Sequence, residues 1–335
     1  MVSEIVLELK DVAAYYRQLT PVGLKVIRAV DGVSLNVHVG EILGVIGESG
    51  SGKSTMANVM MMNVRKPLEF IRGSVRLYTE KGVLNLESMR LDELRKRVWG
   101  SEIAMVPQAS MNALMPTIRI RKLIMDVFES HFDEVDEEEV IKIAMKRFEE
   151  LGLPPWAVHR YPFELSGGMR QRAVLAVATL LNPRLLIADE PTSALDVVTQ
   201  KMVLKTLKSL LSLGIVKSIV FISHDIATVR QIATRIAVMY AGKIVEEGEV
   251  NEIISNPLHP YTQGLIESIA TAEPEIRKRG LKYIPGAPPD LSQPLPGCRF
   301  HPRCPFAMEI CRKEEPPLSE VKPGRPVACW LHIRR

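Results

Sequence analysis

The sequence of 335 residues contains no long apolar run, which argues against a membrane-spanning helix. A span needs about 18 or more consecutive apolar residues, and Ala173–Leu181, among the longest runs here, is far shorter. The N-terminus, Met1-Val2-Ser3-Glu4, also lacks the basic and then apolar layout of a signal peptide. We therefore expect a soluble, cytoplasmic chain that reaches any membrane through a separate partner.

Excess charge and cysteine are also scarce. The 43 basic and 39 acidic residues leave a formal net charge of only +4, too little to indicate nucleic acid as the main partner. The four cysteines all lie between Cys298 and Cys329, so they concern one small region and not the main core. The length predicts about two domains.

One stretch organises the rest of the chain: Gly47-Glu48-Ser49-Gly50-Ser51-Gly52-Lys53-Ser54-Thr55. The apolar run Ile42–Ile46 precedes it and the helix-compatible Met56–Met62 follows, as a phosphate-binding loop requires. Glycines let the backbone turn its N–H groups towards an anion, which the start of a helix also favours. Lys53 would reach the β- and γ-phosphates and Ser54 would ligate Mg²⁺. The alternative is a glycine-rich turn that binds nothing.

Strand and helix patterns alternate along most of the chain, which predicts an α/β fold with a largely parallel sheet. Single strands are expected at Ile5–Leu9, Asp31–Val39, Ile103–Val106, Leu185–Ala188 and Ser218–Ser223, and hairpins at Gly73–Leu86 and Ile236–Glu246. A helical region runs from about Ser110 to Leu181 and includes a helix over Asp133–Gly152. Residues 285–326 hold 11 of the 23 prolines and are expected to have little regular structure.

Acidic and polar side chains follow three of the expected strands. Asp189 and Glu190 end one strand, His224 follows another, and Gln108 follows a third. Ligands bind beyond the carboxyl ends of parallel strands, so Asp189 is placed to support Mg²⁺ and Glu190 to polarise an attacking water. The alternatives are a surface acid pair and a structural histidine.

A second glycine-rich loop, Leu165-Ser166-Gly167-Gly168-Met169-Arg170-Gln171, opens another helix in the helical region. It predicts a second anion-binding helix start. Two such elements on different parts of one chain suggest that two chains share two nucleotides.

Together these motifs resemble those of an ATP-binding cassette (ABC) ATPase over roughly residues 5–250. The resemblance identifies Gly47–Thr55 as the Walker A loop, Gln108 as the Q-loop glutamine, Leu165–Gln171 as the family signature, Leu185–Asp189 as the Walker B strand, Glu190 as the catalytic glutamate, Ser193–Asp196 as the D-loop and His224 as the switch histidine. Tyr16 best matches the aromatic residue that stacks on adenine, with Tyr15 as the alternative because the insertion Leu19–Lys25 makes this alignment the least secure.

The resemblance implies a P-loop NTPase domain over residues 1–250, with an inserted helical subdomain at about 110–181. It implies that Ser54, Gln108 and Asp189 hold Mg²⁺ and that the remaining loop, signature and D-loop residues bind ATP. The implied nucleotide-binding set is Tyr16, Gly47, Ser49, Gly50, Gly52, Lys53, Ser54, Thr55, Asp189, Ser166, Gly167, Gly168, Gln171 and Asp196. Two subunits would close head to tail around two MgATP, and closure and hydrolysis would drive an attached membrane protein.

Further stretches resemble the oligopeptide and dipeptide importer subfamily: residues 108–116, 256–262, 284–289 and 297–305. This implies a C-terminal extension over residues 251–335. The implied partners are a second ATPase subunit, two transmembrane permease subunits and an extracytoplasmic substrate-binding protein, with this chain peripheral at the cytoplasmic face of the membrane. Close relatives also move nickel or oligosaccharides, so the cargo stays open. A soluble ABC ATPase of DNA repair is disfavoured because only about 110 residues, without heptads, separate Lys53 from Ser166.

The spacing of Cys298, Cys304, Cys311 and Cys329 differs from the Cys-x-x-Cys pairs of common zinc sites. Four thiolates in a proline-rich segment are compatible with an iron–sulfur cluster, and the subfamily resemblance implies a [4Fe-4S] cluster here. Zinc, disulfides and unligated thiols remain alternatives. His301 and His332 lie nearby and are interpreted as bystanders.

Overall fold

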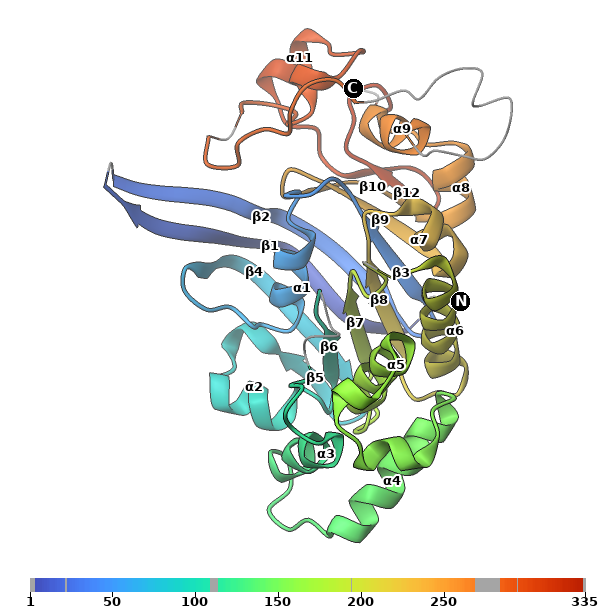
Figure 1. The fold of residues 1–335 in the computed structure, drawn as a ribbon. Coiled ribbons are helices and arrows are strands. Elements are labelled where there is room, and N and C mark those ends of the chain that lie inside the picture. The colour runs from blue at the N-terminus through green and yellow to red at the C-terminus, as the bar shows by residue number, and fades with distance from the viewer. Residues whose placement is uncertain are drawn as a thin grey trace. The chain divides into compact units, whose positions relative to one another are not determined.

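The computed structural model describes residues 4–21, 23–108, 114–193, 195–268, 284–293 and 295–333. The chain forms two compact units, drawn in Figure 1. The first comprises Met1–Leu7, Val37–Glu41 and Arg76–Ile222, and the second comprises Glu8–Asn36, Ile42–Val75 and Ser223–Arg335. In the described ranges, no helix is both long enough and apolar enough to cross a bilayer. The expected domain boundary near residue 250 stays a prediction.

The first unit is built on three parallel strands, β6 (Ile103–Val106), β7 (Leu185–Asp189) and β8 (Ser218–Ile222). Their registers pair Ile103 with Leu185 and Leu185 with Ser218. Every residue of β7 and β8 is buried, as expected of parallel strands that are covered on both faces. The predicted parallel strands are confirmed, and their carboxyl ends fall at one edge, where Asp189 ends β7, Glu190 follows it and Gln108 follows β6.

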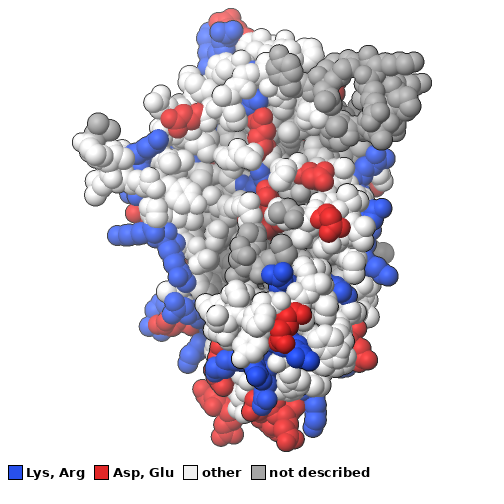
Figure 2. All heavy atoms as spheres, in the orientation of Figure 1, with Lys and Arg blue, Asp and Glu red and all other residues white. Residues whose placement is uncertain are grey.

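The helices of this unit are α2 (Leu91–Arg97), α3 (Ile120–Glu129), α4 (Glu137–Glu150), α5 (Gly167–Ala178) and α6 (Val197–Ser212). The expected helix over 133–152 is confirmed as α4, which begins after Asp136 because that carboxylate accepts the N–H of Glu138 at 2.9 Å. In Figure 2, acidic side chains gather at the lower end of the drawn face, where Figure 1 places the start of α4. Residues 109–113 of the expected Q-loop lie outside the described residues, as does Ala194 of the expected D-loop.

The second unit contains the parallel pair β3 (Ile42–Ile46) and β9 (Arg235–Tyr240), and β9 continues antiparallel into β10 (Lys243–Glu249). The expected hairpin is confirmed, with Tyr240 opposite Lys243 across the Ala241-Gly242 turn. The helices are α1 (Lys53–Met60), α7 (Ile226–Ile232), α8 (Val250–Ser255), α9 (Pro260–Glu267) and α11 (Glu309–Lys313). Helix α1, expected after the phosphate loop, is largely buried.

The C-terminal segment contains more regular structure than its prolines suggest. Strands β11 (Ser319–Lys322) and β12 (Arg325–Val327) form a hairpin, and β12 extends the sheet by pairing Val327 with Glu246 of β10. Arg325 and Val327 point inward on either side of Pro326, and the Arg325 guanidinium bonds Glu246 at 2.6 Å. Most of the described residues of 285–326 lie outside helices and strands, as expected, and the exceptions are a short 3-10 turn, α11, β11 and the start of β12. Strand β12 is the one that composition disfavours, and a buried ion pair anchors it.

The first two strands are also longer than expected. Strand β1 runs over Ile5–Thr20 and β2 over Gly23–His38, and the two lie side by side in Figure 1. Tyr15 and Tyr16 therefore lie within β1 and not between two strands. The hairpin of β4 (Leu68–Thr79) and β5 (Gly82–Asn85) is confirmed, with Thr79 opposite Gly82.

Candidate functional site

The loop between β3 and α1 is tightly packed against neighbouring backbone. Gly52 precedes α1 with φ +106°, and a Cβ there would lie 2.0 Å from the carbonyl oxygen of Ala29. A Cβ on Gly47 would lie 2.1 Å from the carbonyl oxygen of Met239. Both positions therefore require glycine, and the loop keeps a shape in which Ser49 and Gly50 stay exposed to solvent.

Lys53 lies at the start of α1 and folds back over the loop. Its side chain is buried, and Nζ donates to the carbonyl oxygens of Gly47 at 2.8 Å and Glu48 at 2.9 Å. The next residue, Ser54, is exposed. A cation held over a glycine loop at a helix start is an arrangement suited to the phosphates of a nucleotide.

Two neighbouring tyrosines of β1 have different surroundings. The Tyr16 hydroxyl lies 3.2 Å from Oγ1 of Thr55, at the end of the phosphate-loop motif. The Tyr15 hydroxyl instead donates to Asp31 at 2.6 Å, and burial together with this bond raises the pKa of Tyr15. Of the two tyrosines, Tyr16 is therefore the one that contacts α1 at the phosphate loop. Its stacking role stays a prediction.

In the first unit, Glu190 directly follows β7 in a left-handed backbone conformation with φ +47°. Such a conformation in a non-glycine residue costs roughly 1–3 kcal/mol and is common at functional sites. The Glu190 N–H bonds the Ile222 carbonyl at 2.9 Å, and Nε2 of Gln108 donates to Oε2 of Glu190 at 3.1 Å. The structure therefore brings together two of the predicted site residues, Gln108 and Glu190. Asp189, which directly precedes Glu190 in sequence, is buried.

The signature stretch forms the start of α5 in the same unit. Ser166 caps the helix by accepting the N–H of Met169 at 3.3 Å. Gln171 is buried and donates to the Pro191 carbonyl at 2.9 Å, which ties α5 to the loop that follows Glu190. Asp196 caps α6, and a hydrogen bond from the Thr199 hydroxyl lowers the pKa of this carboxyl. The nucleotide contacts assigned to these residues stay predictions.

The two groups of predicted site residues belong to different units. Lys53 and His224 lie in the second unit, and Asp189 and Glu190 lie in the first. The single MgATP site implied for these residues therefore stays a prediction.

The four cysteines are free, and all four line one small cavity with Phe300, Phe306 and Trp330. Burial raises the pKa of Cys298 to about 12 and that of Cys329 to about 11. Four cysteine sulfurs are the donor type of an iron–sulfur cluster, whereas a raised pKa favours the protonated thiol over the thiolate that binds a metal. Within the described ranges, however, no three histidine, cysteine or acidic residues are arranged to hold a metal ion. The ring nitrogens of His301 and His332 are instead within hydrogen-bond distance of the carbonyl oxygens of Cys298 and Leu258.

Arg303 contacts the phosphate loop, and the sequence motifs did not identify it as a site residue. Its guanidinium forms a two-pronged ion pair with Glu48 inside the phosphate loop. The sequence offers one signal for this contact: an acidic residue within a loop that binds anions needs a compensating cation. Nothing in the sequence shows which of the many basic residues supplies it.

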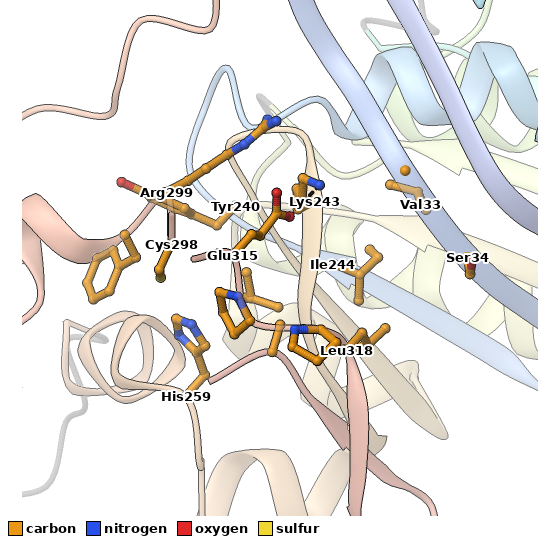
Figure 3. Close-up of a pocket in the computed structure, with 16 residues that line it drawn as sticks. Val33, Ser34, Tyr240, Lys243, Ile244, His259, Cys298, Arg299, Glu315 and Leu318 are labelled. Atoms are coloured by element: carbon orange, nitrogen blue, oxygen red, sulfur yellow. Dashed lines mark ion pairs between the residues drawn. The ribbon is translucent and has the colours of Figure 1, made fainter. Parts of the chain in front are cut away.

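A larger cavity of about 390 Å³ lies beside the β9–β10 hairpin (Figure 3). Lys243 and Glu315 form an ion pair at its wall, and His259, Cys298 and Arg299 lie close by. None of its lining residues comes from residues 47–55, so it is distinct from the phosphate loop.

Two family models match the chain. Residues 30–193 match the ABC transporter family, and residues 245–311 match the C-terminal region of the oligopeptide/dipeptide transporter family.

Similar proteins cover nearly the whole chain. It is 42% identical over 329 residues to the dipeptide transport ATP-binding protein DppD of Caldanaerobacter subterraneus, covering 98% of this chain and 97% of that protein. It is 40% identical over 327 residues to the oligopeptide transport ATP-binding protein OppD of Bacillus subtilis, covering 97% and 88%. Among solved structures, a dimeric ATP-binding cassette in a post-hydrolysis state with ADP and Pi matches with TM-score 0.60 and 29% identity, over 73% of this chain and 98% of that one.

Proposed function

Because this chain belongs to the ABC transporter ATP-binding proteins, in the dipeptide and oligopeptide branch, we propose that its ATPase activity powers the uptake of small peptides. The phosphate loop carries the proposal. Gly47 and Gly52 leave no room for a Cβ, and Lys53 spans the loop between them. The match of residues 245–311 to a peptide-transporter region supports the peptide cargo.

In this proposal each site residue has a distinct task. Lys53 and the loop N–H groups bind the β- and γ-phosphates, Tyr16 stacks on adenine, and Glu190 accepts a proton from the attacking water. Gln108, bonded to Glu190 at 3.1 Å, orients that carboxylate. His224 completes the catalytic set. Bound Mg²⁺ would neutralise phosphate charge, and Ser54, Gln108 and Asp189 are the residues proposed to hold it.

The assembly proposed for this chain is a dimer of cassettes, formed with a paralogue or a second copy. The start of α5, Ser166–Gly168, then faces the nucleotide of the other subunit, with Asp196 near the same interface. Gln171 supports the start of α5 indirectly, because its buried side chain donates a hydrogen bond to the Pro191 carbonyl. This dimer sits at the cytoplasmic face of the membrane, and two transmembrane permease subunits and an extracytoplasmic binding protein complete the transporter.

The proposal for the cysteines is a [4Fe-4S] cluster. Four free thiols lining one cavity support it, and the absence of a closed metal-binding arrangement among the described residues counts against it. Anaerobic purification of the full chain, followed by iron and acid-labile sulfide assays, decides whether the cysteines hold a cluster. Four iron and four sulfide per chain are expected, whereas zinc alone or neither would contradict the cluster.

The cargo is tested on the assembled transporter in proteoliposomes. Phosphate release is measured with the binding protein present and with dipeptides, oligopeptides, oligosaccharides or nickel added in turn. We expect stimulation by peptides only. Stimulation by nickel or by an oligosaccharide, with no response to peptides, would assign the transporter to another cargo.

A further inference from the structure

The turn Cys298–Cys304, within the C-terminal segment, contacts the phosphate loop directly. Nη1 of Arg303 lies 2.7 Å from Oε2 of Glu48, and Nη2 lies 2.9 Å from Oε1. Only 5% of the Arg303 side chain and 25% of the Glu48 side chain are exposed. A two-pronged arginine–carboxylate pair with this little exposure has a defined geometry and is weakly screened by solvent.

Arg303 is itself held in place on several sides. Its Nε donates to the Pro285 carbonyl at 2.8 Å, and its guanidinium lies 5.8 Å from the ring centre of Tyr240 and 6.0 Å from that of Phe300. The hydrogen bonds to Glu48 raise the pKa of Arg303 further above its usual value, so its charge is permanent.

Glu48 is held at its backbone as well as at its carboxylate. Its N–H donates to the Tyr261 hydroxyl at 2.8 Å, and its carbonyl oxygen accepts from Nζ of Lys53 at 2.9 Å. Tyr261 packs against Tyr240, with ring centres 4.5 Å apart. Glu48 is therefore the residue through which Arg303 and this aromatic cluster act on Lys53.

The same turn supports the other side of the loop through Arg299. Figure 3 shows the Arg299 guanidinium directed away from His259, and it bonds Asp31 and the carbonyl of Ala241. The following residue, Gly242, donates its N–H to the Ser51 carbonyl at 2.8 Å. The turn thus supports the phosphate loop at two points.

Glu48 presents an electrostatic problem at an anion site. A carboxylate in a loop that binds a triphosphate repels the ligand and attracts the lysine that should contact it, and partial burial strengthens both effects. The Arg303 guanidinium neutralises this carboxylate from the side of the C-terminal segment.

We propose that Arg303 is a positioning residue of the nucleotide site, which neutralises and orients Glu48 so that the phosphate loop binds ATP. The C-terminal segment is thereby part of the support of the ATP site. This inference rests on the proposed function only in that the phosphate loop binds ATP.

The test compares the full chain, assembled with its permease subunits, with its R303M, R303K and R303M/E48Q variants. We expect R303M to raise KM for ATP at least tenfold while kcat at saturating ATP stays within threefold. R303K keeps the positive charge but loses the two-pronged guanidinium contact, so its KM for ATP should fall between those of the wild type and R303M. R303M/E48Q removes the repelling carboxylate and should recover most of the lost affinity.

The matched control is R325M. Arg325 lies in the same C-terminal segment and forms a still more deeply buried pair with Glu246, away from the phosphate loop. A general loosening of the segment would raise KM in R325M as much as in R303M, and that result would overturn the inference. So would a wild-type KM in R303M, or a double variant no better than R303M. If R303M does not fold, the KM of R303K against R325M decides by the same criteria.

K53A is included so that the test distinguishes a failure of the proposed ATP site from a failure of the proposed role of Arg303. Unchanged ATP affinity in K53A would refute the phosphate loop as the ATP site. Lost affinity in K53A with unchanged affinity in R303M would refute only the role of Arg303.

Discussion

Replacing Gly52 by alanine tests the geometry of the phosphate loop most sharply. An L-residue at φ +106° incurs about 1–2 kcal/mol of backbone strain. The new Cβ would also lie 2.0 Å from the Ala29 carbonyl oxygen and 2.8 Å from the Met239 side chain. Because Ala29 contributes a backbone atom, only a shift of β2 or of the loop relieves the contact, and such overpacking costs about 1–3 kcal/mol. We therefore expect a total loss of about 2–5 kcal/mol in the free energy of unfolding.

Gly50→Ala is the matched control for this prediction. Gly50 also has positive φ, +79°, but nothing lies within 4 Å of its Cβ position, so only the strain of about 1–2 kcal/mol applies. Urea unfolding of both variants without nucleotide measures the difference, and ATP titration then measures affinity. Gly52→Ala should be the less stable by about 1–3 kcal/mol and should bind ATP more weakly. Equal stabilities of the two variants would refute the packing described for the loop.

Three further predictions concern chemistry and pH. Glu190→Gln should keep ATP binding and nearly abolish phosphate release, because an amide accepts no proton from water; unimpaired hydrolysis would remove the proposed role. Lys53→Ala should lose ATP affinity in an equilibrium titration, and undiminished affinity would count against the phosphate loop. Burial, with a smaller contribution from the charge of His332, lowers the pKa of His259 to about 3, so the unfolded chain binds a proton that the folded chain excludes. The resulting stability is full above pH 6.5 and is lost as the pH falls towards 3, by up to about 1.4 kcal/mol per pH unit. A His259→Gln variant with the same acid sensitivity as the wild type would contradict this assignment.

Much of the fold could be predicted from the sequence because its elements depend on local patterns. The continuous apolar runs of β7 and β8 and the turn at Ala241-Gly242 each carry their own signal. Strand β1 could not be delimited in this way, since residues 10–20 mix charged and aromatic side chains. Strand β12 was missed because Pro326 disfavours a strand, while the Arg325–Glu246 pair that fixes it joins residues far apart in sequence.

The phosphate loop was predictable for a similar reason, since its glycines, lysine and flanking elements are contiguous. The Gln108–Glu190 contact was foreseeable only as two strand ends at one edge. The support from Arg303 could not be predicted, because Arg303 and Glu48 are 255 positions apart in sequence and their contact depends on where the C-terminal segment packs.

ATP-driven peptide uptake by the reconstituted transporter tests the central claim most directly. Proteoliposomes containing the permease subunits, this chain and its ATPase partner subunit are supplied with a labelled dipeptide, the binding protein and internal ATP. We predict accumulation that needs ATP and is lost when this chain carries Glu190→Gln. Uptake that is independent of ATP, or unaffected by Glu190→Gln, would contradict the account.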